Sequence, residues 1–506
     1  MATKTSQEEL LAKITKHHAE YDANLAKWQQ NLDAYGGTGG FSNGSYLIKY
    51  PAEQDAKFTL RKSAAYYYNF CKTISDAFNG AIYKKKIIRD GNDNLKEFWN
   101  SCDYSRQKDM DSFMKQVQLY ANNIGHCFVM VDSPKNEAQN RLQEIENGIR
   151  PYVYLLSPTV VYDWGIDNIT KELTFIKILE PIMSNPDDPL ADHTIVNQYR
   201  IWSKNKWELY DAEGSLIDSG INTLGIVPVV VVYNEQTPGS LIGVSEINEI
   251  SDICKALYNK LSERDYILKS QGFAILCLPG DAPAAGETLT IETNGVYYYK
   301  VENGTPSFIA PPFTSVESYD RAIKDHIEIM FQLARLRATG GVMPSGVSLK
   351  FQFEQTNQSL IKKAGHLRDA ELQIAKIVNL INGNDNKTKA TIISYPKDYS
   401  VDDIVTELEN AFRVISMKMG ITFNTEYKKS MVNKLLPDAT DDIIEKIKSE
   451  IEALQNEQAI DKTKNDEATN TERPQTDPVD QLQGNIGYVN DENGNNIPIK
   501  KRTKTS

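Results

Sequence analysis

The chain has 506 residues, 40% of them hydrophobic, and a formal net charge of -12. This length accommodates two to four structural units. The acidic balance argues against a protein that grips nucleic acid through a broad basic face, but it is compatible with one that surrounds DNA without holding it. No apolar run approaches the roughly 18 residues of a membrane span, and the N-terminus lacks the charged-then-apolar pattern of a signal peptide.

The first half of the chain predicts a mixed unit of helices followed by strands. Residues 1–35 and 58–83 have helical spacing of apolar residues, and a glycine-rich stretch at 36–40 between them is interpreted as a flexible linker. A helix at 109–123 precedes an apolar strand at 125–132, and residues 152–232 are mostly strands separated by turn residues. Residues 1–242 therefore form an α+β unit in this interpretation.

The next segment predicts a stalk of two long helices around a small β insert. Apolar residues recur at steps of three and four over 245–270 and again over 313–338, which places each set on one helix face. Between them, Asn294-Gly295 and Asn303-Gly304 are typical hairpin turns, because both residue types tolerate positive φ. Such a stalk leaves apolar flanks, and identical stalks in a ring would bury them. The two stripes are Ile247, Ile250, Cys254, Leu257 and Leu261, and Ile323, Ile327, Met330 and Ala334.

After the stalk the pattern changes three times. Residues 347–353 alternate like a strand, and a helical pattern begins at 357 and continues to 381. Residues 401–455 predict two or three further helices. Beyond about residue 456 the chain is polar and low in aromatic residues, which predicts disorder. A basic tip at 500–504 could contact DNA or an acidic partner, or simply be solvated.

The search for chemistry finds no catalytic or metal-binding pattern. The sequence lacks GxSxG, HExxH, Walker and dinucleotide-binding motifs. His17 and His18 are adjacent on a predicted helix and would point about 100° apart, with no third ligand nearby. His126 and Cys127 are neighbours in a predicted strand, so their side chains face opposite ways and do not form a nucleophile–base pair.

The cysteines give information about the redox setting. They are odd in number and widely spaced, and no two form a CxxC pair, which favours a reduced, cytosolic setting with buried thiols over disulfides. The five are Cys71, Cys102, Cys127, Cys254 and Cys277.

Several short stretches, taken in order over about residues 40–455, resemble the portal proteins of tailed bacteriophages. The first group is Tyr46-Leu47 followed by Arg61, 66–69, Thr73 and 78–84, and the second is 125–134. The third is Tyr152 followed by 157–158 and 161–164. The last two are Val227-Pro228, ahead of the 243–270 helix, and 345–350. None is specific alone, but the ordered set agrees with the stalk interpretation. The resemblance is to a family of rings through which DNA enters and leaves the capsid.

The resemblance implies a portal-like α+β fold with named regions. They would be an α/β wing (1–242), two stem helices (243–270 and 313–338), a small β-rich clip (271–312), a channel loop with a long wing helix (339–399), a helical crown (400–455) and a disordered tail (456–506).

The same resemblance implies a structural role in the virion, with no enzyme activity, no cofactor and no metal. The ring, usually of twelve chains, would be made in the host bacterial cytoplasm and would sit at one capsid vertex. It would pass double-stranded DNA without sequence specificity and contact the major capsid protein and scaffold. It would dock the terminase large subunit and then the head–tail adaptor, and it would have no membrane partner.

Two sets of candidate residues follow from this mapping. The DNA-channel set combines basic residues of the stem with glycines and polar residues of the channel-loop segment 339–355, because glycines permit tight turns beside DNA: Gly340, Gly341, Lys350, Gln352, Gln355, Lys255, Lys260, Lys324 and Arg335. The partner-docking set lies in the clip: Asp281, Glu287, Glu292, Lys300 and Glu302.

Two alternatives stay open at the level of sequence. One is another ring-forming connector or adaptor of the virion, although such proteins are usually shorter and lack a stalk of this length. The other is a cytosolic α+β enzyme whose site has no recognisable motif. Gel filtration separates them, because an enzyme of that kind would not form a large ring.

Overall fold

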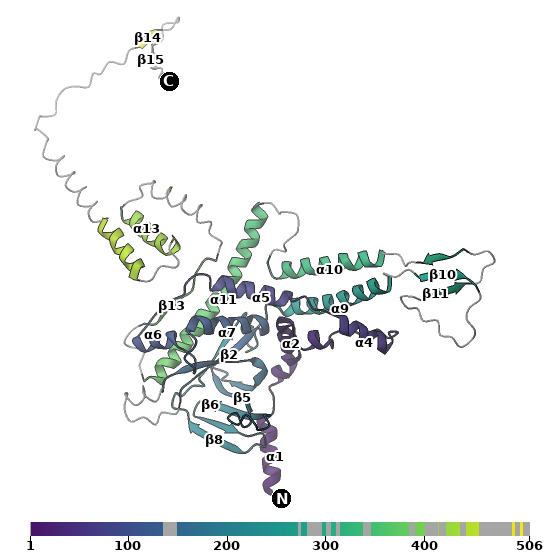
Figure 1. Ribbon diagram of the computed structural model, residues 1–506. Coiled ribbons are helices and arrows are strands. Elements are labelled where there is room, and N and C mark those ends of the chain that lie inside the picture. Colours follow the sequence, from purple (N-terminus) through teal and green to yellow (C-terminus); the bar gives the residue numbers. More distant parts are fainter. Residues whose placement is uncertain are drawn as a thin grey trace, which may run out of the picture. The chain divides into compact units, whose positions relative to one another are not determined.

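The computed structural model combines helices and sheets, which confirms the predicted mixed fold class (Figure 1). Two compact units divide the chain, Met1–Val401 and Asp402–Ser506. The described residues are 2–134, 149–271, 275–280, 296–299, 305–309, 314–336, 346–383, 390–399, 413, 421–435, 442–454, 488–490 and 496–498.

The N-terminal segment of the first unit is helical, but the helix predicted over 1–35 is two helices. They separate at residues 15–18, where His18 is extended and its ring nitrogen accepts a hydrogen bond from the backbone N–H of Glu20. This side chain therefore caps the second helix. The helices are α1 (Ala2–Ile14), α2 (Ala19–Gly36), α3 (Gly40–Asn43), α4 (Asp55–Ala64) and α5 (Phe70–Ile82).

The glycine-rich stretch is an ordered turn, so its interpretation as a flexible linker is wrong. Gly37 ends α2 in the left-handed conformation with φ of 65°, and Gly39 has φ of 52°. A Cβ on Gly39 would lie 2.1 Å from the carboxylate of Asp33. The same carboxylate accepts a 2.8 Å hydrogen bond from the hydroxyl of Tyr46. The glycines are needed because the chain turns tightly around a partly buried polar contact.

A three-stranded antiparallel sheet forms the centre of the unit. Strand β2 (His126–Asp132) lies between β3 (Tyr152–Leu156) and β9 (Val229–Tyr233). Helix α7 (Met110–Ile124) and the long helix α11 (Gly346–Ile381) contact β2 and β9. All but the last residue of β2 are buried, which explains why its sequence is a continuous apolar run.

A second, five-stranded antiparallel sheet follows the chain in sequence order. Its inner face buries Trp164, Ile176, Ile178 and Trp202, and the 3-10 turn Pro158–Val160 leads into it. A separate antiparallel pair is formed by β1 (Ile88–Asp90) and β13 (Ile392–Ser394), and helix α6 (Asp93–Asn100) follows β1 in the chain. The five strands are β4 (Val161–Ile166), β5 (Leu173–Met183), β6 (Ile195–Ser203), β7 (Lys206–Tyr210) and β8 (Leu216–Ile221).

The stalk consists of α9 (Asn248–Gln271) and α10 (Thr314–Leu333), with a small sheet at the far end (Figure 1). In that sheet β10 (Ile275–Pro279) lies between β11 (Val296–Tyr299) and β12 (Ser307–Ile309). Because β11 is parallel to β10 and β12 is antiparallel to it, the two strands that flank Asn303-Gly304 do not pair with each other. The predicted hairpin there is wrong, and β10 takes the place between them.

Helix α11 begins at Gly346, so the strand-like alternation predicted over 347–353 is also wrong. Once a helix has formed, each further residue adds a hydrogen bond at little extra entropic cost. Leu349, Lys350 and Gln352 are good helix formers. The helix that the pattern predicts from residue 357 therefore extends toward its N-terminus through the alternating stretch.

In the second unit, α13 (Ile421–Leu435) and the helical residues 442–454 lie within the segment predicted as helical. Lys429 forms one ion pair with Glu426 within α13 and another with Glu452, and the second pair joins the two helices. In the tail predicted to be disordered, β14 (Tyr488–Asn490) and β15 (Asn496–Pro498) form an antiparallel pair, which the low apolar content did not predict. Across both units, none of the described helices has the length and apolar character needed to cross a membrane.

Candidate functional site: the stalk and its root

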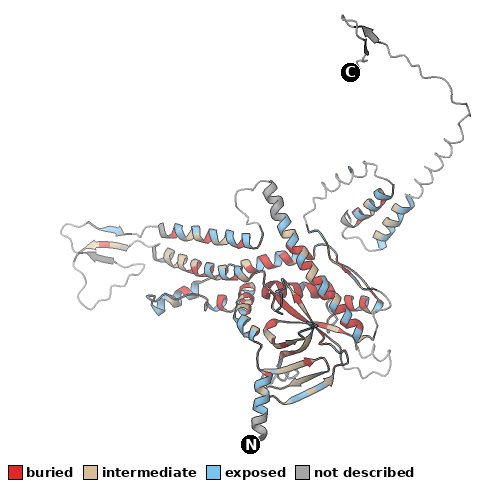
Figure 2. Cartoon of the chain, turned by 180° about the vertical axis from the view of Figure 1, so that it is seen from behind, coloured by how far each residue is buried: buried red, intermediate tan, exposed pale blue. Residues whose placement is uncertain are grey.

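Helix α9 is the element around which the stalk is built, and it lies between α10 and α4 (Figures 1 and 2). The apolar stripe predicted for it is buried, and so are three of the four stripe residues of α10, Ile323, Met330 and Ala334. Ile327 is partly buried against the same core. The two helices therefore pack through the faces that their sequence periodicity predicted.

The root of the stalk is clamped to the end of α7. The Ser245 hydroxyl lies 3.0 Å and 2.8 Å from the carbonyl oxygens of Asn122 and Asn123, and the N–H of Glu246 donates to the Asn122 carbonyl at 2.9 Å. Gly125 and Gly243 pass so close that a Cβ on either would lie 2.2 Å from the carbonyl oxygen of the other. These contacts fix the direction in which α9 leaves the sheet.

A buried lysine of α11 joins the same region. The ammonium of Lys363, whose side chain is 3% exposed, donates to Glu246 Oε2 at 2.8 Å. It also contacts the side-chain oxygens of Asn234 and Asn122. Burial lowers the pKa of Lys363, because removal from water disfavours the charged form. One cation thus links α11, α7, the end of β9 and the start of the stalk.

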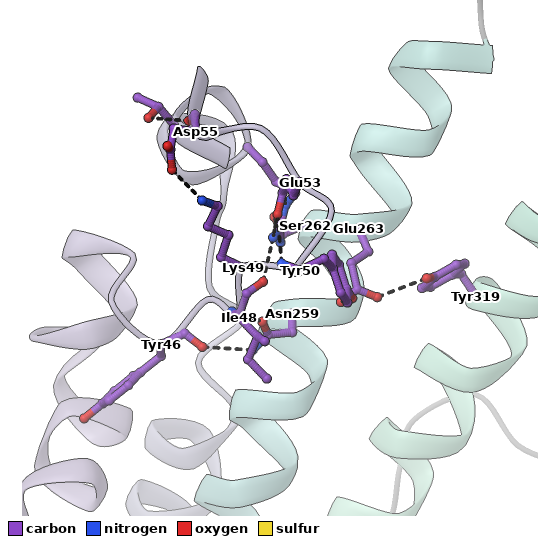
Figure 3. A network of polar contacts seen from close by, with 12 residues as sticks. Tyr46, Ile48, Lys49, Tyr50, Glu53, Asp55, Asn259, Ser262, Glu263 and Tyr319 are labelled. Carbon is purple, nitrogen blue, oxygen red and sulfur yellow. Dashed lines mark hydrogen bonds and ion pairs between the residues drawn. The ribbon is translucent and has the colours of Figure 1, made fainter. Parts of the chain in front are cut away.

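Farther along the stalk, Arg61 of α4 contacts Glu53, Ile48 and Ser262 of α9, and Figure 3 shows these three partners together. Arg61 donates from Nε and Nη2 to the two carboxylate oxygens of Glu53 at 2.9 Å and 2.8 Å. It also donates to the Ile48 carbonyl at 2.7 Å and contacts the Ser262 hydroxyl at 3.5 Å. This fork-to-fork geometry is the strongest form of carboxylate pairing. Asn259 of α9 continues the network by accepting from the N–H of Ile48 at 2.8 Å.

Polar contacts also join the two stalk helices. The Tyr319 hydroxyl of α10 donates to Glu263 Oε2 of α9 at 3.0 Å, and Tyr50 donates to the other oxygen of the same carboxylate (Figure 3). Arg264 of α9 forms an ion pair with Asp320 of α10 at 3.3 Å. Glu263 is therefore shared by α10 and the 46–50 segment, so the stalk and the N-terminal segment form one connected structure.

These contacts change the expectation that both flanks of the stalk are left open by its own chain. The predicted stalk had two apolar flanks, but the chain's own α2, α4 and 46–50 segment cover one flank of α9. The surface left open is that of α10, which carries exposed residues along its length (Figure 2). It is mostly polar, with two exposed apolar residues near the root, Ile329 and Leu333. The other exposed residues are Glu317, Ser318, Arg321, Lys324, Asp325, Glu328 and Gln332.

The structure brings together only part of the predicted channel set. Arg335 and Gln355 line one open hollow of about 460 Å³ at the root, with Glu354, Gln358, Ser359 and Lys362. Lys324 is exposed on α10 and Lys260 is half-buried on α9. Lys255 faces the N-terminal segment, with its ammonium 4.5 Å from the centre of the Tyr46 ring.

The remaining candidates are only partly within the described residues. Lys350 and Gln352 belong to α11, so they are on a helix and not on the predicted loop. Gly340 and Gly341 lie outside the described residues, and so do the five docking candidates Asp281, Glu287, Glu292, Lys300 and Glu302.

Sequence reasoning missed the residues that position the stalk. Lys363 is a buried cation whose partners come from distant segments. Arg61 is a buried cation that pairs with the nearby Glu53 and also contacts the distant Ser262. No local pattern marks either residue. Arg335 adopts a positive φ of 55°, which is uncommon for a residue with a side chain, and its carbonyl accepts a 2.7 Å hydrogen bond from the Thr356 hydroxyl. This contact places the end of α10 beside α11.

The described residues include no group of three His, Cys, Asp or Glu side chains that could hold a metal ion. His126 is fully buried in β2, and burial lowers its pKa to about 3. Its Nδ1 lies 3.4 Å from the N–H of Gly243, whereas the thiol of Cys127 contacts the Val117 carbonyl at 3.4 Å. The two neighbours therefore have separate partners, as the strand alternation predicted.

A sequence model of the family described as "Phage portal protein, SPP1 Gp6-like" matches residues 14–459. The chain therefore belongs to this family, which confirms the resemblance that the sequence stretches indicated. Its function is that of a portal, the connector of the virion, and the family is one of structural proteins and not of enzymes.

Among solved structures, the chain is similar to one described as "Neck of empty GTA particle computed with C6 symmetry", at 8% identity and a TM-score of 0.38, covering 75% of this chain and 95% of that one. Another is described as "Virion of native gene transfer agent (GTA) particle", at 8% identity and a TM-score of 0.34, covering 77% and 94%. No curated protein matches the chain.

Proposed function

We propose that twelve copies of this chain assemble into a closed ring at one vertex of the capsid, and that double-stranded DNA passes through its centre during packaging and ejection. The observation that carries the proposal is the family match over residues 14–459, which includes the stalk and the segments that precede and follow it in the chain. The stalk geometry supports it, because α9 is anchored to its own chain while α10 keeps an open face for contacts beyond the chain.

In this proposal the regions have separate tasks. The two helices at 243–270 and 313–338 form the stem through the vertex, and residues 271–312 form the clip outside the shell. The wing (1–242 with the long helix) and the crown (400–455) lie inside, where they meet the major capsid protein and the scaffold. The clip docks the terminase large subunit first and the head–tail adaptor later. The terminase supplies ATP hydrolysis.

The net negative charge of the proposed ring favours DNA that slides through the channel over DNA that is bound tightly. With -12 per chain, a ring of twelve carries a net charge of about -144 and repels phosphate as a whole. Basic residues temper this repulsion locally. Lys324 and Arg335 are the best channel candidates of the set, because both are exposed at or beyond α10. Lys255 is a weaker candidate, because its ammonium is engaged with Tyr46.

The test of the proposal removes the clip and keeps the stem. A variant with residues 271–312 replaced by a short Gly/Ser linker should still form rings in negative-stain images but should no longer recruit the terminase or support DNA packaging. A variant in which residues 185–192, the mostly exposed connection between β5 and β6, are replaced by the same linker is the matched control and should package DNA normally. Normal packaging yield from the clip deletion would contradict the docking assignment.

A finer test addresses the docking residues. Reversing the acidic clip residues Asp281, Glu287 and Glu292 to lysine should weaken terminase binding and leave ring formation unchanged. The equivalent reversal of Asp187, Asp192 and Glu213 serves as the control, because these acidic residues are exposed in the 1–242 segment and lie outside the stalk and its open face. If both triple variants bind terminase equally well, the clip charges play no part in docking.

A further inference from the structure

Sulfur atoms from three helices meet inside the root of the stalk. The Cys71 thiol of α5 lies 3.5 Å from the Cys254 thiol of α9, and the Met330 sulfur of α10 lies 3.4 Å from that of Cys254. All three side chains are buried. The contact lies where the stalk helices meet the helices of the N-terminal segment, so a bond formed there would act on the attachment of the stalk.

The geometry of the two thiols is close to that of a disulfide. Two sulfurs at 3.5 Å are in van der Waals contact, and a disulfide requires about 2.05 Å. Side-chain rotation with a small shift of one helix can supply the difference, because α5 and α9 already pack against each other. The cysteines are 183 positions apart in the chain, so the bond would be a covalent link between two segments that are distant in the sequence.

The two thiols are not equivalent. Cys71 donates its hydrogen toward the sulfur of Cys254. This contact lowers the pKa of Cys254 and raises that of Cys71, because it stabilises the thiolate of the acceptor. Cys254 is therefore the better nucleophile of the pair, since the thiolate is the reactive form.

We propose that Cys71 and Cys254 are a latent disulfide that closes when the protein meets a peroxide and locks α9 to α5. The Cys254 thiolate attacks one oxygen of hydrogen peroxide. The O–O bond breaks, and a sulfenic acid and hydroxide form. The hydroxide takes the proton of Cys71, whose sulfur then attacks the sulfur of Cys254. The S–O bond breaks, and hydroxide leaves and is protonated to water. Two thiols and one peroxide thus give one disulfide and two waters.

The chemistry of this pair does not depend on ring assembly, whereas its use rests on the proposed function. In the reducing cytoplasm where the chain is made, the thiols stay reduced. In a particle released from the cell, oxidation would hold the stalk against the N-terminal segment.

The test uses the purified full-length protein and its thiol map. After hydrogen peroxide treatment, the protein is denatured, alkylated and digested. We expect two of the five cysteines to escape alkylation. We also expect one cross-linked peptide pair, containing Cys71 and Cys254 and lighter by two hydrogen atoms than the separate peptides. A reducing agent should restore both thiols, and oxidation should raise the thermal unfolding midpoint.

Matched variants isolate the pair. Cys71→Ser should abolish the cross-link, whereas Cys102→Ser, at another buried cysteine, should leave it intact. Three outcomes would overturn the proposal: all five thiols still alkylated, a cross-link through a different cysteine, or Met330 gaining an oxygen atom while both thiols stay reduced. The wild-type map decides the matter even if Cys71→Ser does not fold. Because the readout is a mass, it is independent of ring formation and packaging.

Discussion

The attachment of α4 to the 46–53 segment, and through that segment to α9, should depend on a single side chain. Arg61 is the only residue of α4 that is buried, and its guanidinium makes four contacts with Glu53, Ile48 and Ser262. Arg61→Met would keep the length of the side chain but would leave the Glu53 carboxylate, which is 10% exposed, without its cation. We therefore expect α4 to open from α9 much more often in the variant.

The size of the effect follows from the burial of the pair. Breaking a buried ion pair by removal of one partner destabilises by roughly 3–5 kcal/mol. Because Glu53 keeps some contact with solvent, we expect the lower end, about 3 kcal/mol. At 25 °C this corresponds to about a 150-fold increase in the population of the opened state. Arg61→Lys keeps the charge but loses the two-point geometry, so its effect should be smaller.

Native-state hydrogen exchange read by mass spectrometry measures this opening directly. Amides of residues 46–64 should exchange about 150-fold faster in Arg61→Met, while those of β2 keep wild-type rates. Arg368→Met is the control, because Arg368 is half exposed and pairs with its neighbour Asp369. The reasoning is refuted if α4 amides in Arg61→Met exchange within twofold of wild type, or if Arg368→Met accelerates them equally.

Three further predictions concern pH and the stalk contacts. Arg61 lowers the pKa of Glu53, so the pair stabilises the fold above the unfolded pKa of about 4.3 and loses this contribution as the pH falls through the lower folded value. The difference in unfolding temperature between wild type and Glu53→Gln should therefore shrink in acid, and a constant difference contradicts this. Burial lowers the pKa of Lys363, so the free energy of unfolding should rise with pH between the folded pKa and about 10.4. Thermal unfolding of Lys363→Met should lack that rise, and equal slopes would exclude it. Tyr319→Phe removes one hydrogen bond to the Glu263 carboxylate. Because the acceptor is charged, the free energy of unfolding in urea should fall by about 1.5 kcal/mol, with rings still forming. A loss above about 3 kcal/mol would mean that the hydroxyl has another role.

The sequence was sufficient for elements whose signal is local. The stripe from Ile247 to Leu261 and the apolar run of β2 are repeated patterns, and the structure buries both. The family could also be predicted, because the order of many short stretches carries information that no single stretch carries. These inferences need only neighbouring residues and their order along the chain.

Contacts between distant segments could not be predicted in this way. Arg61 and Ser262 are 201 positions apart, and Lys363 and Asn122 are 241 apart. In sequence, a buried lysine looks the same as an exposed one. The same limit explains β11, whose parallel pairing with β10 depends on the path of the chain and not on its own alternation. The contact of the Lys255 ammonium with the Tyr46 ring is another pairing that no local pattern predicted, and the DNA-channel set stays a prediction.

The central claim is that copies of this chain form a ring around a channel. Negative-stain imaging of the purified full-length protein, with mass photometry of the same sample, measures this most directly. We predict closed rings with a central hole wide enough for a DNA duplex and a mass of about twelve chains. A single species of 57.0 kDa that persists at high protein concentration would contradict the claim.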